Sequence, residues 1–495
     1  MSDTRERLAK VGRRAVGLAA QRTPYWAPFL TLAWCIAGCA VGPDFERPQA
    51  PPSTHYTADA TPPDLSPGLD SPQVISFGAP PVRWWQAYHS KTLDALVEEG
   101  LAHNADIASA TSSLLGAREA LSAQVGSSEL PYASLSGELA HERSIGLPDF
   151  GPPTSIYKLY AGVINVGYDL DLFGGIRRAN EASRAQVEMQ ALELRAARQV
   201  LAGNIVMTAI RAAALHEEIQ ATERLVELAR TAEALTRQRY ALGAAPHRDV
   251  LDALRAKETA AAALSPLRTQ WAHDRHALAV LLGRTPEQAP EDLPFASLTL
   301  PSDLPISVPS ELVHTRPDIL ASEASLHAAN AKLGLATANL YPQISLTGTY
   351  GSESFTRGEF LRSPTTVWGL AAGVTQPLFA GGSLRARQRQ AQDDLESARE
   401  RYRSAVLRAF QNVADALRTL EEDAHLESER KGAEGAARNF FEETERRYRL
   451  GSETILAVVN SEQTWQEERT NQIDSASARL LDTAALFEAI GAPEE

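Results

Sequence analysis

The chain has 495 residues, of which 44% are hydrophobic, so it is long enough to bury a substantial core. Its 62 acidic side chains outnumber the 48 basic ones and give a formal net charge of -14, which makes nucleic acid an unfavourable partner. Only two cysteines are present, which excludes a domain held together by several disulfide bonds.

Residues 1–38 have the pattern of a bacterial secretory signal peptide. A basic region is followed by an apolar stretch over 25–37, which is too short to span a membrane and remain there. The stretch ends in Ala37-Gly38-Cys39, and a cysteine in this position resembles the lipobox of bacterial lipoproteins. We therefore expect a covalent lipid, with palmitate among its acyl chains, on Cys39. The alternative is a free cysteine behind an ordinary signal.

Lipidation would tether the mature protein to a membrane face, since each buried methylene adds about 0.8 kcal/mol. Loss of residues 1–38 removes six basic and two acidic side chains, so the formal net charge moves from -14 to -18. Cys39 is then the only cysteine, so no disulfide can form within the chain. The residue directly after Cys39 is not an aspartate, and the first acidic residue is Asp44. By resemblance to bacterial lipoproteins, this argues mildly against retention at an inner membrane.

Residues 39–82 are predicted to be an extended N-terminal segment outside the core, because proline pairs recur along it. Beyond it we predict two internal repeats, 83–300 and 301–491, and a tail, 492–495. Three segments recur in the same order at separations of 211, 206 and 208 residues, which indicates a duplicated half-domain rather than a short solenoid unit. The pairs are Leu130-Pro131-Tyr132 with Leu340-Tyr341-Pro342, Leu172-Phe173-Gly174-Gly175 with Leu378-Phe379-Ala380-Gly381-Gly382, and Arg239-Tyr240-Ala241-Leu242-Gly243 with Arg447-Tyr448-Arg449-Leu450-Gly451.

Each repeat is predicted to contain a helix, two strands, a long helix and a second helix. The first helices are expected over 93–130 and 310–340. The long helices, over 176–242 and 383–450, contain no proline, and at 1.5 Å per residue each would be roughly 100 Å long. The second long helix has a seam of residues spaced three or four apart, which indicates packing against partner helices. The seam residues are Leu395, Ala398, Tyr402, Ala405, Ala409, Val413, Ala416 and Leu420.

The strands are expected over 131–143 and 157–169 in the first repeat, and over 343–354 and 366–376 in the second. Apolar and smaller or polar residues alternate along them, which fits a tilted bilayer crossing by strands of about ten to twelve residues, although any half-buried hairpin alternates similarly. No window has the roughly 18 consecutive apolar residues of a membrane helix. Four strands cannot close a barrel, since the smallest membrane barrels use eight, so we expect several copies to share one. Three copies would supply twelve strands.

These motifs together resemble the TolC-type outer-membrane channels, nearest the OprM/NodT-like lipoprotein branch that serves tripartite efflux pumps. The resemblance covers almost all of residues 39–491 and rests on the duplicated turn segments and on both ends of the mature chain. The two ends are Cys39-Ala40-Val41-Gly42-Pro43-Asp44-Phe45 and Leu486-Phe487-Glu488-Ala489-Ile490-Gly491.

The resemblance implies a mainly α fold with membrane β-strands, a TolC-like α-barrel/β-barrel in which a homotrimer shares one twelve-stranded barrel. It places the protein in the bacterial outer membrane, lipid-anchored, with its helices forming a tunnel through the periplasm. A periplasmic membrane-fusion adaptor and an inner-membrane pump, usually of the RND class, would dock beneath it. Such a channel conducts drugs or other small molecules passively, with no catalytic residue, no metal and no cofactor beyond the lipid on Cys39.

The resemblance also implies an adaptor-contact tip at the two Arg-Tyr-x-Leu-Gly turns. The tip residues are Leu242, Gly243, Leu450 and Gly451. Each glycine follows a long helix, where a left-handed residue lets the chain reverse, so the alternative is that these are ordinary helix C-caps.

Just past each turn, the resemblance implies a pore constriction lined by acidic residues. Asp249 and Asp252 are three apart and hence on one face of the helix that follows. The matching positions in the second repeat are Ala457 and Asn460, where the family often has aspartate at one or both. Glu453 or Glu462 is then the alternative source of acidic charge in this repeat. The full set of constriction candidates is Asp249, Asp252, Asn460, Tyr240, Tyr448, Arg447 and Glu453. Any one of these acids is equally explained as a solvated surface charge.

An enzyme is disfavoured, because His216-Glu217 lacks the second histidine of a zinc motif and no nucleophile or phosphate-loop motif is present. Asp169-Leu170-Asp171 admits a calcium site, but a turn acid is the simpler explanation. Two other functions stay open, a type I protein-secretion outlet and a lipid-anchored periplasmic coiled-coil scaffold. The scaffold explains neither the strand pairs nor the duplication.

Overall fold

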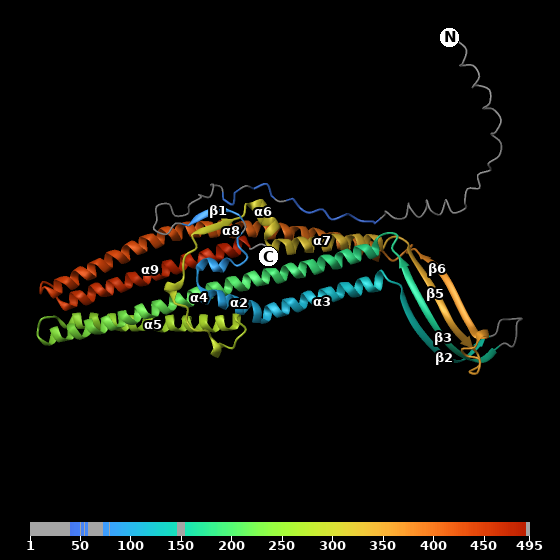
Figure 1. Cartoon of the computed structure of the whole chain (residues 1–495), viewed down its shortest axis with the longest axis horizontal. Coiled ribbons are helices and arrows are strands. Elements are labelled where there is room, and N and C mark those ends of the chain that lie inside the picture. Colours follow the sequence, from blue (N-terminus) through green and yellow to red (C-terminus); the bar gives the residue numbers. More distant parts are fainter. Residues whose placement is uncertain are drawn as a thin grey trace, which may run out of the picture. The chain divides into compact units, whose positions relative to one another are not determined.

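The structure is a computed structural model that describes residues 40–49, 51–53, 55–57, 73–78, 80–145 and 154–491 (Figure 1). The predicted signal peptide, the predicted lipidation residue Cys39 and the tail lie outside the described residues. The chain divides into two compact units, each of which is described by itself. Among the described residues, the sheet unit contains 40–42, 131–145, 154–177 and 337–380, and the helical unit contains the remainder.

The sheet unit is a four-stranded antiparallel sheet with the strand order β2-β3-β5-β6. Its strands are β2 (Tyr132–Ile145), β3 (Thr154–Leu170), β5 (Gln343–Ser354) and β6 (Thr366–Thr375). The two repeats meet at the centre, where β3 pairs with β5 and Val163 lies opposite Gly351. A Cβ atom at Gly351 would collide with the Gly162 carbonyl, so only glycine fits at this junction.

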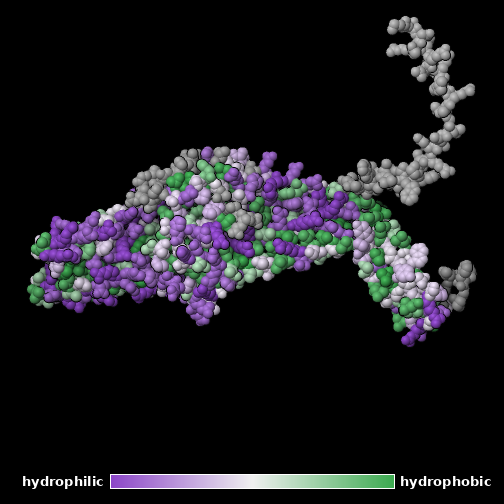
Figure 2. All heavy atoms as spheres, viewed as in Figure 1, coloured by the Kyte–Doolittle hydropathy of each residue, from purple (hydrophilic) through white to green (hydrophobic). Residues whose placement is uncertain are grey.

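One face of this sheet is apolar and the other is polar. Residues directly opposite each other on neighbouring strands point to the same face. One row that crosses all four strands is apolar and exposed, and it consists of Leu135, Ile164, Tyr350 and Trp368. The adjoining row, on the opposite face, is Ser134, Asn165, Thr349 and Gly369. Apolar residues are correspondingly prominent on the sheet in Figure 2.

The described part of the helical unit contains two pairs of long helices and four shorter ones. The helices are α2 (Lys91–His103), α3 (Ala105–Ser128), α4 (Gly175–Ala241), α5 (His247–Leu281), α6 (Pro309–Thr315), α7 (Pro317–Ala338), α8 (Ser383–Arg449) and α9 (Ile455–Ile490). α4 and α8 have 67 residues each, so each is roughly 100 Å long at 1.5 Å per residue. Within the described ranges, no helix has both the length and the apolar character that crossing a membrane requires.

The first helix of each repeat is divided in two, which differs from the uninterrupted helices expected over 93–130 and 310–340. Asn104 separates α2 from α3, and its side chain accepts hydrogen bonds from the N–H groups of Asp106 (2.8 Å) and Ile107 (3.2 Å). It therefore ends one helix and caps the next. In the second repeat Arg316 separates α6 from α7, and Pro317 begins α7, a position that suits its fixed φ angle.

Part of the N-terminal segment also differs from expectation, because it joins the core. β1 (Val74–Phe77) pairs in parallel with β4 (Asp303–Ile306), and Ile75 is buried. The buried Gln73 side chain donates hydrogen bonds to the Pro301 carbonyl (3.0 Å) and to Thr483 Oγ1 (3.1 Å). Proline-rich composition predicted an extended chain, but it did not predict that these residues would complete a two-stranded sheet.

The core of the helical unit extends from a short 3-10 helix, η1 (Trp84–Tyr88), to the end of α9. The Trp84 ring stacks on Phe487 with a centroid separation of 5.3 Å, and the Tyr88 hydroxyl donates to the Leu480 carbonyl (2.9 Å). Full burial of each large apolar side chain contributes about 1.5–3 kcal/mol. On α8 the predicted seam is buried at Ala398, Tyr402, Ala409, Val413 and Leu420.

Candidate functional site

The turn after α4 closes the helix with a Schellman motif. Gly243 has a φ of 72°, and its N–H donates to the Tyr240 carbonyl (2.9 Å). The N–H of Ala244 donates to the Arg239 carbonyl (2.8 Å). These are the two hydrogen bonds that define the motif, and they satisfy carbonyl groups that the helix end leaves without partners. α5 begins at His247 directly afterwards.

The turn after α8 has the same structure. Gly451 has a φ of 79°, its N–H donates to the Tyr448 carbonyl (2.9 Å), and the Ser452 N–H donates to the Arg447 carbonyl (2.9 Å). The Thr454 side chain then caps α9. Both turns lie at the same end of the helical unit (Figure 1). The duplicated sequence therefore folds into duplicated turns.

Each turn exposes a leucine just before its glycine. Leu242 is 76% exposed and Leu450 is 84% exposed. A Cβ atom placed on Gly243 or Gly451 meets no atom within 4 Å, so the left-handed backbone rather than crowding requires glycine here. The four predicted tip residues therefore close their helices and are also exposed. Closing a helix leaves them free to contact another protein.

The tyrosine and arginine candidates occupy the last helical turns before these glycines. The half-exposed Tyr240 ring lies 5.3 Å from the His247 ring across the turn. Tyr448 is also half-exposed. Arg447 Nε donates to Glu443 Oε1 (3.1 Å), so this arginine pairs along its own helix rather than across helices. Hydrogen bonds from Arg447 and then Arg446 hold the pKa of Glu443 below its ordinary value.

Asp249 and Asp252 lie on the first two turns of α5. Asp249 is near the helix N-terminus, where negative charge is favourable, and Asp252 is the more exposed of the two. Arg248 Nε is 3.8 Å from Asp249 Oδ1, and Arg255 Nε is 3.9 Å from Asp252 Oδ1. Sequence reasoning did not include these two arginines, which leave the group of four side chains close to neutral.

The second-repeat candidates are less acidic. Asn460 is exposed on α9, and Glu453 is exposed in the turn before it. Glu462, the other suggested substitute, accepts hydrogen bonds from Nε (2.8 Å) and Nη2 (2.6 Å) of Arg224 on α4. It therefore joins α4 to α9 rather than offering a free carboxylate.

Two carboxyl pairs in the helical unit were missed from the sequence. Burial, and then a hydrogen bond with Asp474 on α9, raise the pKa of Glu218 on α4 to about 8. Burial, and then a hydrogen bond with Asp482 on α9, raise the pKa of Asp423 on α8 to about 7. A proton shared within each pair lets it fasten α9 to a neighbouring helix. The only sequence signal is an acidic residue within a buried stretch of a helix.

Asp171, at the end of the Asp169-Leu170-Asp171 segment, serves the turn that follows β3. Asp171 accepts hydrogen bonds from the N–H groups of Ile176 (3.0 Å) and Arg177 (2.8 Å), so it caps the start of α4. Among the described residues, no group of three or more His, Cys, Asp or Glu side chains is placed to hold a metal ion. The turn-acid explanation therefore accounts for Asp171.

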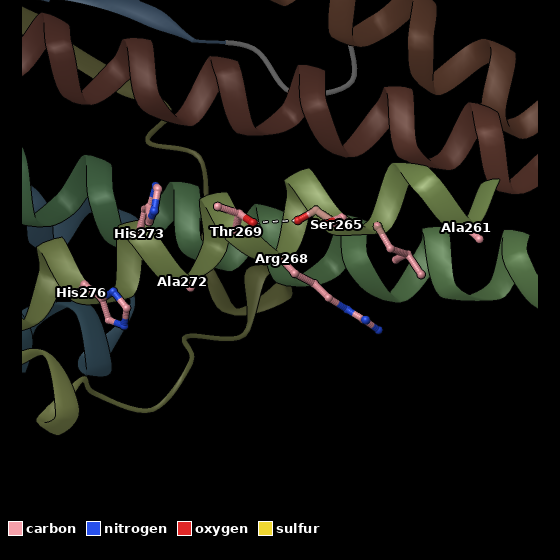
Figure 3. A pocket seen from close by; sticks show the side chains of 8 residues that line it. Ala261, Ser265, Arg268, Thr269, Ala272, His273 and His276 are labelled. Carbon is pink, nitrogen blue, oxygen red and sulfur yellow. Dashed lines mark hydrogen bonds between the residues drawn. The ribbon is translucent and has the colours of Figure 1, made fainter. Parts of the chain in front are cut away.

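A shallow hollow of about 530 Å³ lies along α5 (Figure 3). Thr269 Oγ1 at its centre donates to the Ser265 carbonyl (3.0 Å) one turn earlier, and Arg268 pairs with Glu223 of α4 (2.6 Å). His273 and His276 complete the polar lining. Its lining residues have no activated nucleophile with a base beside it, so the hollow has no catalytic arrangement.

The chain belongs to the outer membrane efflux protein family, whose model matches residues 96–284 and 308–492. The two matched segments follow the two internal repeats. The chain is thus an outer-membrane channel component of efflux machinery, with the TolC-like α-barrel/β-barrel fold. The family is one of passive channels rather than enzymes, and it uses no cofactor.

Known relatives agree with this membership and with an outer-membrane location. The chain is 28% identical over 431 residues to the pyoverdine export outer membrane protein OpmQ of Pseudomonas putida, covering 86% of this chain and 91% of the relative. It is 24% identical over 443 residues to nodulation protein T of Rhizobium leguminosarum bv. trifolii, covering 89% and 91%. The solved outer-membrane channel OprN superposes with a TM-score of 0.79 at 26% identity, covering 92% of this chain and 99% of that one. The resemblance to the OprM/NodT-like branch is confirmed.

Proposed function

We propose that the chain is the exit duct of a tripartite efflux pump, assembled as a homotrimer and anchored by lipid on Cys39. A periplasmic membrane-fusion adaptor and an inner-membrane pump of the RND class deliver drugs or other small molecules, and the duct conducts them passively to the exterior. The observation that carries the proposal is the open sheet with one apolar face, one polar face and two edge strands.

The sheet edges support the trimer. β2 and β6 are the outer strands of the described sheet, and each has a neighbour on one side only. In lipid, every edge N–H or C=O without a partner costs several kcal/mol, so an open sheet cannot cross a membrane alone. Pairing β6 of one copy with β2 of the next removes both edges, and three copies supply the twelve strands of a closed barrel.

The test of this assembly is the molar mass of the detergent-extracted protein. Light scattering corrected for bound detergent should give three chains per particle. The same particles in planar bilayers should conduct ions, because the polar rows of the sheet would line the lumen. A monomer that never conducts would contradict the proposal.

We assign adaptor contact to Leu242, Gly243, Leu450 and Gly451. The two turns have the same backbone hydrogen bonds, lie at the same end of the helical unit and each expose a leucine. Two equivalent turns in each of three subunits would offer six similar positions to a surrounding adaptor. That number suits adaptor hairpins that bind alike at both turns.

We assign the pore constriction to the last turns of α4 and α8 and the first turns of α5 and α9. Threefold symmetry would convert Asp249 and Asp252 into two rings of carboxylates, which attract cations. Arg248 and Arg255 beside them reduce that field. The α9 side contributes Asn460 and Glu453, and the α4 and α8 ends contribute Tyr240, Tyr448 and Arg447.

Lipidation is tested by mass spectrometry of the mature N-terminus. The wild-type protein should begin at an acylated Cys39, and Cys39→Ala should lack the lipid mass. An unmodified Cys39 in the wild type would refute the anchor and leave the channel proposal standing. The name of the relative OpmQ, a protein of pyoverdine export, supports a small-molecule substrate rather than a secreted protein.

A further inference from the structure

We propose that residues 40–47 form a strap that a polar cradle on α4 and α7 binds in one register, which fixes where the acylated N-terminal residue lies. The strap directly follows Cys39, so the acylation part of this inference rests on the proposed function. The cradle consists of Arg178 and Glu181 on α4 with Glu323, His327 and Asn330 on α7.

The strap and the cradle carry opposite charges in matching order. Arg178 Nη2 donates to Asp44 Oδ1 (2.7 Å), and Arg47 Nε donates to Glu323 Oε1 (2.6 Å). A strap bound in the reverse direction would place like charges together at both positions. Such like-charge contacts disfavour the wrong arrangement, so charge order selects the direction of the strap.

Along the strap, an aromatic stack lies between the two ion pairs and a backbone hydrogen bond lies just before the first of them. The Phe45 ring stacks on His327 with a centroid separation of 4.3 Å and an interplanar angle of 15°. Asn330 Nδ2 donates to the Pro43 carbonyl (3.0 Å). His327 Nε2 lies 2.8 Å from Glu181, so the residue under Phe45 is itself held by the cradle.

Three of the five cradle residues are buried, and Glu181 and His327 are partly exposed. Arg178 is 5% exposed, and Glu323 and Asn330 are each 6% exposed. Gly334 of α7 makes room for the arginine, because a Cβ atom there would lie 2.9 Å from Arg178 Cδ. Buried charges require partners, and the strap supplies one to Arg178 and one to Glu323.

In the sheet unit, the first strap residues lie against the turn between β3 and α4. The Val41 N–H donates to the Phe173 carbonyl (3.1 Å). A Cβ atom at Gly174 would lie 2.8 Å from the Ala40 Cβ, so this glycine leaves space for the strap. Because Cys39 precedes Ala40 directly, the acylated end of the mature chain would begin at this turn.

The corresponding turn of the other repeat, Leu378-Phe379-Ala380-Gly381-Gly382, has no such strap among the described residues. Leu378 is 93% exposed and Phe379 is 91% exposed, and a Cβ atom on Gly381 would meet nothing within 4 Å. In the first repeat, by contrast, Phe173 is only partly exposed and Gly174 is buried. Each chain has two copies of the turn but one N-terminus, which accounts for the difference.

The test places a nitroxide spin label on the strap through Glu46→Cys, because Glu46 is exposed. The reference protein also has Cys35→Ser and Cys39→Ser, so that the label site is the only thiol whether or not the signal is removed. Arg178→Ala removes the centre of the cradle, and Asp44→Ala with Arg47→Ala removes the strap charges without touching helix packing. Arg385→Ala is the matched control, since Arg385 follows the duplicated Gly-Gly pair at the same spacing and is exposed.

The reference and Arg385→Ala proteins should give an immobilised nitroxide spectrum, and Arg178→Ala and the strap variant should lose most of that component. A mobile label in the reference, or an immobilised one in the strap variant, would overturn the inference whatever Arg178→Ala does. Acylation is measured separately on the protein with Cys39 intact. An unmodified Cys39 with an immobilised label refutes the anchor alone, and an acylated Cys39 with a mobile label refutes the strap alone.

Discussion

α4 and α8 are two copies of one helix in different surroundings. Both have 67 residues, and both end in a Schellman motif with an exposed leucine. More than twice as many residues of α4 as of α8 are buried. Helix length and helix ends depend on local sequence, whereas burial depends on neighbouring elements. The two helices therefore have the same structure at their C-terminal ends but differ in how much of their surface is buried.

The two copies are stabilised by different means. α4 contributes Ile205, Val206 and Ile210 to the core, all fully buried. The exposed face of α8 instead carries ion pairs along the helix, among them Arg418 with Glu421 (2.8 Å) and Arg449 with Glu445 (2.6 Å). Such pairs contribute only about 0.2–0.5 kcal/mol each, which is less than the burial of one large apolar side chain of α4 contributes.

The largest expected effect comes from removing the apolar side chain that the two turns share. Leu242→Glu with Leu450→Glu should abolish drug resistance in a strain that relies on this channel, since each leucine buried by an adaptor contributes about 1.5–3 kcal/mol. Each single variant should lose about tenfold or more in adaptor affinity, measured by pull-down and by inhibitory drug concentration.

The matched control for the tip is Leu361→Glu, because Leu361 is equally exposed at 76% but lies in the loop between β5 and β6. It should leave resistance intact. If only one of the two tip leucines matters, the turns are alike in structure but unlike in use.

The carboxyl pairs on α4 and α8 should make the free energy of unfolding depend on pH over two different ranges. A carboxyl group whose pKa is raised by folding holds its proton more tightly in the folded state, so stability is greatest at low pH. It falls as pH rises from the unfolded to the folded pKa. The fall extends from pH 4.5 to about 8 for Glu218 and from pH 3.8 to about 7 for Asp423.

Glu218→Gln should therefore raise stability at pH 8 relative to wild type by about 1–2 kcal/mol, a figure reduced from the full pKa shift for solvent screening. Melting temperatures at pH 5, 7 and 8 provide the measurement. Asp423→Asn should remove only its own share of the fall between pH 3.8 and about 7, because Glu218 still contributes from pH 4.5 upward. Only Glu218→Gln should change the interval from pH 7 to pH 8. Glu467→Gln, at an exposed position of α9, should leave the profile unchanged.

The two turn glycines should respond equally to substitution. Gly243→Ala and Gly451→Ala each place a Cβ in the left-handed region and should each cost about 1–2 kcal/mol. Gly432→Ala is the control, since Gly432 lies inside α8 with open space around it and should instead gain about 0.5–1 kcal/mol. Thermal melting measures all three. Unequal losses at the two turns would break the equivalence that the hydrogen bonds indicate.

The smallest effect concerns the acids that follow α4 but not α8. Asp249→Ala with Asp252→Ala should raise single-channel conductance in planar bilayers and reduce cation preference. Arg248 and Arg255 are then left without their acidic neighbours, so the rings become positive. Asn460→Ala, at the matching position after α8, changes no charge and should leave selectivity as it is. Currents that do not change would remove Asp249 and Asp252 from the constriction.

The predicted features that the structure also contains are those with local causes. Absence of proline predicted the long helices, alternation predicted two-faced strands, and glycine after Arg-Tyr-x-Leu predicted the helix ends. The missed features depend on residues far apart in the chain. Glu462 pairs with Arg224, which is 238 residues away, and Gln73 bonds to Thr483, which is 410 residues away. No local pattern specifies such partners.

The sequence by itself determined that this chain has two similar halves, each with a strand pair, a long helix and a glycine-closed turn, because local residue patterns specify those elements. Only the tertiary structure decided which copy of each element is covered. Arg178 meets Asp44, which is 134 residues away, while the equivalent Arg385 is exposed. The physical reason is that burial and charge pairing depend on the residues packed around a segment, and two similar segments are surrounded by different residues once the chain folds.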